Sequence, residues 1–259
     1  MDMLLSYGSR IKLLHQANQG PEVARNLGAS RSDAEYLAFL DSDDLFLPRA
    51  LETYDKLIEV YNSPPLILGS MTYFKEGDPI GNPADQGTAI EVLKYEDFLS
   101  KDTAVGMSSS KIVIRRKIFE EAGGLRRSTP TTFHLDDYNL MLRTGTYGPC
   151  IIVQTPTTVA YRSHSANSIR DTKAMVSGIL ALIHAEGRGE YPGGRHRRFA
   201  RYACIGGPAI QWGRRSLKTR RLFFILNFLM RATPMIAASV LKKVWIRFRG
   251  TQSSIILNA

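Results

Sequence analysis

The chain has 259 residues, 44% of them hydrophobic, so it can bury one sizeable core. Its two cysteines exclude a disulfide framework and fit a reducing compartment, which predicts a cytoplasmic protein. The formal charge of +10 lies in the C-terminal part, where residues 186–259 carry fifteen basic and two acidic side chains; the preceding residues have a net charge of −3. The asymmetry predicts an anionic partner, and without a helix-turn-helix, zinc-finger or RNP-like pattern we expect no nucleic acid.

Strands and helices alternate through the first 168 residues. In chain order the pattern predicts a strand at 10–15, a helix at 21–30, a strand at 36–40, a helix at 48–61 and a strand at 66–74. It continues with a short helix at 95–100, a strand at 109–115, helices at 116–122 and 136–144, and extended segments at 151–154 and 158–162. This alternation predicts an α/β fold, with a mostly parallel sheet flanked by helices.

After residue 168 the pattern predicts helices only, at 179–186, 195–202, 216–231 and 234–248. We therefore expect a first domain over residues 1–168 and a basic, helical extension over residues 169–259. The apolar run at 222–230 is interrupted by Arg231 and Pro234, and it falls short of the ~20 apolar residues of a spanning helix. Two interpretations stay open: a helical hairpin packed on the domain, or an interfacial helix with its arginines on anionic head groups at the cytoplasmic face of a membrane.

Three carboxylates follow the predicted strand at 36–40, in the stretch from Asp41 to Asp44. The carboxyl end of a strand is where open α/β sheets place their ligands. Clustered carboxylates repel one another, and a hard divalent cation that also holds a phosphate would offset that repulsion. The alternative is a solvated turn in which Asp44 or a neighbour caps the helix that begins near Pro48.

Three blocks of this sequence resemble the family 2 glycosyltransferases, enzymes with the GT-A fold. The first runs from His15 to Leu51 and matches an N-x-G-x-x-x-A-R-N-x-G helix followed by a strand and D-x-D-D. The second contains GGL at 123–125 and DDYNLMLR at 136–143, and the third is YRSH at 161–164. Their order and spacing match the family pattern over about residues 10–168. The resemblance implies a GT-A-like domain that acts in polysaccharide biosynthesis for the cell envelope.

The resemblance also implies the roles of individual residues. Asp43 would be a direct ligand of Mn²⁺ or Mg²⁺, with Asp41 near the ribose and the metal-bound waters, and His164 as a further ligand. The donor-binding set would be Asp41, Arg25, Asn26 and Arg162. Asp137 would be the catalytic base, which takes the proton of the acceptor hydroxyl in an inverting transfer. Asp136 and Asp137 are alternatively favourable first-turn residues of a helix, and Arg25 and Asn26 an ion pair and a cap within the core.

The implied substrates are a nucleotide-sugar donor and a saccharide or lipid-linked saccharide acceptor. The Q-x-x-R-W segment of processive family members is not reproduced by residues 211–215, so we expect single-sugar addition. Family members normally place a strand, a helix and a second strand before the N-x-G segment, whereas residues 10–12 here begin the match almost at once. We therefore expect an N-terminally truncated domain. The alternative function is a catalytically inactive remnant or a membrane-associated interaction module.

Overall fold

The computed structural model describes residues 7–78, 80, 89–126, 135–164, 171–217 and 222–257. Its elements up to residue 164 are η1 (Gly8–Arg10), α2 (Pro21–Ser30), β1 (Tyr36–Ala38), β2 (Leu45–Phe46), α3 (Ala50–Val60), β3 (Leu66–Leu68), β4 (Met71–Phe74), β5 (Ile90–Tyr95), η3 (Phe98–Ser100), η4 (Ser109–Lys111), β6 (Ile112–Arg115), α4 (Arg116–Glu121), α5 (Asp136–Arg143), β7 (Cys150–Thr155) and β8 (Val159–Arg162). These are followed by α6 (Thr172–Gly187), η6 (Arg195–Arg197), α7 (Arg198–Ser216), α8 (Leu222–Arg249) and β9 (Ile255–Leu257). The predicted α/β architecture is confirmed. The predicted domain boundary at residue 168 lies outside the described residues.

The main sheet has six strands in the order β1-β6-β3-β7-β5-β9. Its strand directions are mixed, which corrects the expectation of a mostly parallel sheet. Strands β3 and β7 pair in parallel, while β6 runs antiparallel to both β1 and β3, and β5 runs antiparallel to β7 and β9. Alternation of strands and helices indicates helical crossovers, but it does not fix the direction of strands that are joined in other ways.

A second, three-stranded sheet has the order β2-β8-β4. The strand predicted over residues 66–74 is in fact two strands, because β3 belongs to the main sheet and β4 to this small one. Strand β2 follows the acidic stretch directly, and β8 ends at Arg162. The small sheet therefore brings the end of β8 beside residues 41–44, although more than a hundred residues separate them in sequence.

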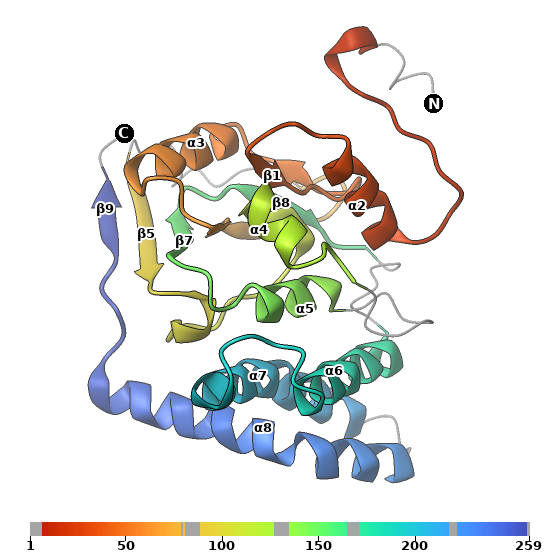
Figure 1. Ribbon diagram of the computed structural model, residues 1–259, viewed down its shortest axis with the longest axis vertical. Helices are drawn as coiled ribbons and strands as arrows, with labels where there is room; N and C mark the ends of the chain where they lie inside the picture. Colours follow the sequence, from red (N-terminus) through yellow and green to blue (C-terminus); the bar gives the residue numbers. More distant parts are fainter. Residues whose placement is uncertain are drawn as a thin grey trace.

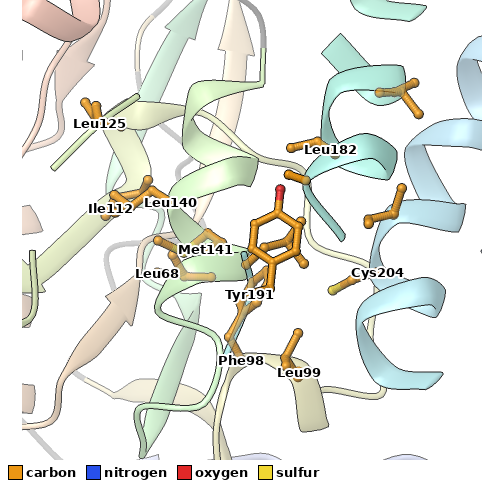
Figure 2. Close-up of a cluster of buried hydrophobic side chains, with 14 of the residues drawn as sticks. Leu68, Phe98, Leu99, Ile112, Leu125, Leu140, Met141, Leu182, Tyr191 and Cys204 are labelled. Atoms are coloured by element: carbon orange, nitrogen blue, oxygen red, sulfur yellow. The ribbon is translucent and has the colours of Figure 1, made fainter. Parts of the chain in front are cut away.

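Helices α6, α7 and α8 form a layer beside the sheet, with α5 between α7 and the strands (Figure 1). One hydrophobic core joins this layer to the sheet domain. Figure 2 shows Leu140 and Met141 of α5 in the same buried cluster as Leu182 of α6 and Cys204 of α7. Trp212 and Phe228 are also buried in this cluster. The helical extension is thus packed on the first domain through shared apolar side chains.

The C-terminal helices differ from their prediction. Residues 222–249 form one helix, α8, with Pro234 inside it, instead of two helices separated at that proline. A proline removes one backbone hydrogen bond, and packing against neighbouring helices can carry the helix through it. After α8 the chain returns to the sheet, where β9 pairs with β5 (Figure 1). The extension therefore also supplies an edge strand, which the sequence pattern did not predict.

The strand predicted at residues 10–15 is not formed. Residues 8–10 are a 3-10 turn that lies apart from the body of the molecule (Figure 1). The segment that follows leads back to α2 and has no partner strand among the described residues. Ile11, Leu13 and Leu14 are exposed. An extended segment needs a neighbouring strand to pair its backbone groups, so its apolar pattern alone does not make it a strand.

The contact between α7 and α8 depends on Gly206. A β-carbon added there would lie 2.0 Å from the backbone oxygen of Met235 in α8. We expect Gly206→Ala to lower stability by about 1–3 kcal/mol, because the two backbones must move apart. Gly207→Ala is the matched control, since its β-carbon would meet nothing within 4 Å. Thermal melts that give both variants the same midpoint would contradict this close packing.

Candidate functional site

The acidic stretch after β1 forms the first part of the candidate site. Asp41, Asp43 and Asp44 each place a carboxylate oxygen within 4.8 Å of the others. The side chains of Asp41 and Asp43 are 31% and 40% exposed, while Asp44 is buried. An all-oxygen donor set with accessible carboxylates fits Mg²⁺ or Mn²⁺. Asp41 and Asp43 are the members of this group that a cation can reach.

Asp44 is buried and supports the acidic stretch through hydrogen bonds. Its carboxylate accepts a hydrogen bond from Ser110 Oγ at 2.6 Å and another from the backbone N–H of Arg162 at 3.0 Å. Ser110 Oγ in turn accepts from the backbone N–H of Asp41 at 3.0 Å. Burial raises the pKa of Asp44, and the hydrogen bonds that its carboxylate accepts from Ser110 and Arg162 oppose that rise. Asp44 therefore fixes the turn between β1 and β2 to β8 and η4; it does not cap α3.

Arg25 joins the acidic stretch to a second pair of carboxylates. From α2 its guanidinium forms ion pairs with Asp41 and, at 3.2 Å, with Asp136 at the start of α5. The Arg25 side chain is only 16% exposed, so its charge is poorly screened by solvent. Arg25 lines the cleft and forms the ion pairs of the alternative interpretation, and its part in donor binding stays a prediction. It brings the first and second sequence blocks together.

Asp136 and Asp137 begin α5, where carboxylates are favourable. The preceding Leu135 has a φ of 64°, an uncommon left-handed conformation for a branched residue, and it lines the same cleft. Asp137 is half-buried and accepts a hydrogen bond from the Tyr138 N–H at 2.6 Å. Burial, with the adjacent charge of Asp136, raises the pKa of Asp137 to about 7. A carboxylate with this pKa can exchange a proton near neutral pH.

Asn26 has a structural position. Its side-chain amide donates to the Leu125 carbonyl at 2.8 Å and accepts from the Leu125 N–H at 2.9 Å. A β-carbon at Gly124 would lie 2.6 Å from Asn26 Oδ1, so the glycine is needed there. Arg143 donates to the Gly124 carbonyl at 2.6 Å from the other side. Asn26 is absent from the lining of the cleft. Asn26 therefore holds the GGL turn, and its part in donor binding stays a prediction.

Arg162 and His164 lie at the end of β8, beside Asp43. His164 Nε2 is 2.8 Å from an Asp43 carboxylate oxygen, which places both within reach of one cation. Arg162 Nε donates to the Asp43 carbonyl at 3.0 Å, and its guanidinium lies 4.8 Å from the centre of the Phe74 ring. Arg162 does not line the cleft. Its contact positions Asp43, and its part in donor binding stays a prediction.

A cleft of about 760 Å³ extends to the helical layer from Arg25 and the carboxylates of Asp41, Asp43, Asp136 and Asp137; His164 is absent from its lining. The sequence pattern did not predict several residues that line this cleft. One lies in the loop after η3 and the others on α7 and α8: Lys101, Gln211, Trp212, Lys242 and Lys243. Tyr73 and Tyr161 also line the cleft. A family motif ending at residue 164 gives no signal for side chains that only the packing of α7 and α8 brings to the cleft. The volume lies within the usual range for small-molecule sites.

Comparisons with known proteins find glycosyltransferases. The sequence model described as "Glycosyl transferase family 2" matches residues 1–123. An uncharacterized glycosyltransferase of Rickettsia bellii is 51% identical over 53 residues, which are 20% of this chain and 8% of that protein. The succinoglycan biosynthesis protein ExoW of Rhizobium meliloti is 28% identical over 131 residues, which are 43% of this chain and 39% of ExoW. This chain thus spans less than half the length of these relatives.

The fold has a counterpart among solved structures. The crystal structure of S. aureus TarS 1-349 in complex with UDP-GlcNAc superposes with a TM-score of 0.59 and 12% identity, covering 96% of this chain and 79% of that one. At that identity the likeness concerns the fold alone. The family match covers α2, β1 and the acidic stretch, which contribute to the cleft, and it ends at the start of the GGL turn. Residues 1–123 are thus similar to glycosyl transferase family 2.

Proposed function

We propose that this chain transfers a sugar, with inversion, from a nucleotide diphosphate donor to a saccharide or lipid-linked saccharide acceptor. One observation carries the proposal: Arg25 joins Asp41 and Asp136, so that carboxylates from two distant blocks line one cleft. The family match supports glycosyl transfer in general. The UDP-GlcNAc in complex with TarS supports a nucleotide-sugar donor. The name of ExoW supports a place in polysaccharide biosynthesis.

In this proposal Asp43 and Asp41, with His164, hold Mn²⁺ or Mg²⁺. The cation would offset the negative charge of the donor diphosphate as it leaves. Asp44 and Arg162 fix the backbone of Asp43, so that its carboxylate meets the cleft in one orientation. Arg25 limits the repulsion between Asp41 and Asp136 before any donor is bound.

Asp137 is the base in this mechanism. With its pKa raised to about 7, its ionised form can accept the proton of the acceptor hydroxyl as that oxygen attacks the anomeric carbon. The bond from the anomeric carbon to the diphosphate breaks on the opposite face, so the configuration inverts. Tyr138 donates its backbone N–H to Asp137 and keeps the carboxylate oriented. The product leaves after one transfer, in line with the absence of the processive segment.

Release of nucleoside diphosphate tests this function directly. The chain is incubated with UDP-sugars, with and without Mn²⁺, and free UDP is measured against an EDTA control. We expect metal-dependent release that rises when an acceptor saccharide is added. Binding of UDP that needs no metal, without turnover for any sugar, would instead favour an inactive remnant.

We also propose that α8 rests on an anionic membrane at the cytoplasmic face. Residues 225–249 are long and apolar enough to cross a membrane by length and composition alone. One face of α8 is nevertheless packed on α7 through Phe228 and Met235. The exposed residues of its second half are mostly apolar or basic: Val240, Leu241, Lys243, Val244, Trp245, Arg247, Phe248 and Arg249. This combination is typical of a helix that lies at the interface.

We expect the chain to bind phosphatidylglycerol vesicles in low salt and to bind neutral phosphatidylcholine vesicles much more weakly. Trp245→Ser, which removes a side chain that is 55% exposed, should weaken this binding several-fold. Phe199→Ser is the matched control, because Phe199 is 51% exposed on α7. Vesicle co-sedimentation measures both. Equal binding of the two variants and the unaltered chain would contradict the proposed surface.

A further inference from the structure

The cleft has two ends of opposite charge. The carboxylates of Asp41, Asp43, Asp136 and Asp137 surround Arg25 at one end. At the other end the lining contains three lysines, Lys101, Lys242 and Lys243. The ends are linked through neighbouring residues: Tyr138 adjoins Asp137 and lies within electrostatic range of Cys204, and Cys204 Sγ is 2.9 Å from Lys101 Nζ. The cleft therefore runs from the acidic end, past the base, to a cationic end.

The lysines at the cationic end are held in different ways. Lys101 is 6% exposed, and its ammonium lies 3.5 Å from the centre of the Phe98 ring. Lys242 donates to the Leu99 carbonyl at 3.0 Å, and burial lowers the pKa of Lys242. Lys243 is exposed and has no hydrogen-bond or ion-pair partner within the described part of the chain. Lys101 and Lys242 are thus close enough for their like charges to repel, and Lys243 adds a third ammonium group to the same cleft.

The charged groups around these lysines do not neutralise them. Asp102 lines the same end, and its two carboxylate oxygens accept hydrogen bonds from the Tyr95 hydroxyl and, at 2.7 Å, from the Gln252 N–H. Arg197 adds positive charge nearby, but it is paired with Asp97. The lining at this end therefore contains one carboxylate and three lysines, which leaves a net positive charge where the cleft meets α8.

We infer that this cationic end binds a phosphate group carried by the acceptor. The inference rests on the proposed function, since it assigns the acceptor to the end of the cleft beyond Asp137. Lysine binds phosphate as a point charge, and Lys242 and Lys243 both project from α8 into the cleft lining. Gln211 lines the same region and offers a polar group for the sugar, while the buried Trp212 forms part of the wall. The diphosphate of the donor is a separate ligand, because the carboxylate end repels it unless a metal is bound.

Fluorescence can test this site without any glycosyl transfer. The sequence has two tryptophans, so Trp245→Phe leaves Trp212 in the cleft as the single reporter. In EDTA, which removes the metal-dependent donor site, this protein is titrated with a hexose 1-phosphate and with the neutral hexose. We expect a saturable change with the phosphate and none with the hexose. Added Lys243→Gln should weaken the binding about tenfold, because it deletes one charge-assisted contact.

Arg247→Gln in the same background is the matched control, since Arg247 lies on α8 outside the cleft lining. It should leave the affinity unchanged. Equal weakening by both variants, or no saturable change with the phosphate, would overturn the inference. A second titration presents the phosphate as phosphatidic acid in neutral micelles. Tighter binding there, weakened more by Lys243→Gln than by Arg247→Gln, assigns a lipid-linked acceptor, because the outer face of α8 would be affected by both variants alike. Tighter binding of the soluble ester assigns a phosphorylated saccharide. The donor assay, metal-dependent UDP release, reports separately on the proposed function.

Discussion

Asp43→Ala is expected to abolish metal-dependent donor turnover. Asp43 is the most exposed of the three clustered carboxylates, and His164 and the backbone contact from Arg162 orient it. Loss of residues that only support a metal ligand typically costs 10–100-fold in activity, so loss of a ligand itself should exceed about 100-fold. Release of UDP at saturating Mn²⁺ measures turnover, and calorimetry with Mn²⁺ and UDP measures binding. Both should fall together.

Two further variants make the result specific to the site. Asp55→Ala removes an equal charge from the exposed face of α3 and should leave turnover unchanged. Asp44→Asn should lower the thermal midpoint. Each oxygen of the buried Asp44 carboxylate accepts one hydrogen bond, from Ser110 Oγ and from the Arg162 N–H, and an amide has only one oxygen that can accept. If the Asp43→Ala protein kept Mn²⁺-dependent turnover, the acidic stretch would be a solvated turn and the metal assignment would be wrong.

The sequence predicted the acidic half of the site because each motif there is local. Asp41 and Asp43 directly follow β1, and Asp136 and Asp137 directly begin α5, so their spacing carries the information. The same motifs gave no way to separate residues that face the cleft from those that support it. Asn26, Arg143 and Arg162 are parts of the matched pattern, but their hydrogen bonds go to backbone groups. Only the three-dimensional path of the backbone shows this division.

The remaining errors concern contacts between distant segments. Strand β9 forms because β5 offers an edge more than 150 residues earlier, and the apolar pattern of three residues cannot predict that pairing. Helix α8 continues through Pro234 because α7 packs along it, with Gly206 against Met235. The cationic end of the cleft was missed for the same reason. Lys101 and Lys242 lie in one cleft only because α8 packs against η3, where Lys242 donates to the Leu99 carbonyl.

Asp137→Asn is expected to remove transfer while leaving donor binding largely intact. The amide keeps the shape of the side chain and can still accept from the Tyr138 N–H, but it cannot take a proton. Loss of a general base lowers the rate by about 10²–10⁴-fold. Calorimetry with Mn²⁺ and UDP should give nearly the value of the unaltered chain, in contrast to Asp43→Ala. An equal loss of UDP binding in both variants would contradict their separate roles.

The raised pKa of Asp137 makes the same variant testable by pH. In the unaltered chain, kcat/KM should rise with pH to a plateau above about 7, because only the ionised carboxylate acts as the base. Asp136→Asn should move this rise to lower pH, since it removes the neighbouring charge that favours protonation.

The stability of the folded chain should fall as pH rises, whereas kcat/KM rises. A carboxyl group whose pKa is raised from 3.8 to about 7 on folding binds a proton more tightly in the folded than in the unfolded chain. Its ionisation therefore destabilises the fold progressively between about pH 4 and pH 7. Because asparagine stays neutral, the thermal midpoint of Asp137→Asn should exceed that of the unaltered chain by a few degrees at pH 8, and the difference should vanish near pH 4. If Asp137 is a catalytic carboxylate that destabilises the fold, Asp137→Asn should be both more stable and inactive at pH 8. A lower midpoint of the variant at every pH would instead show that Asp137 only stabilises α5.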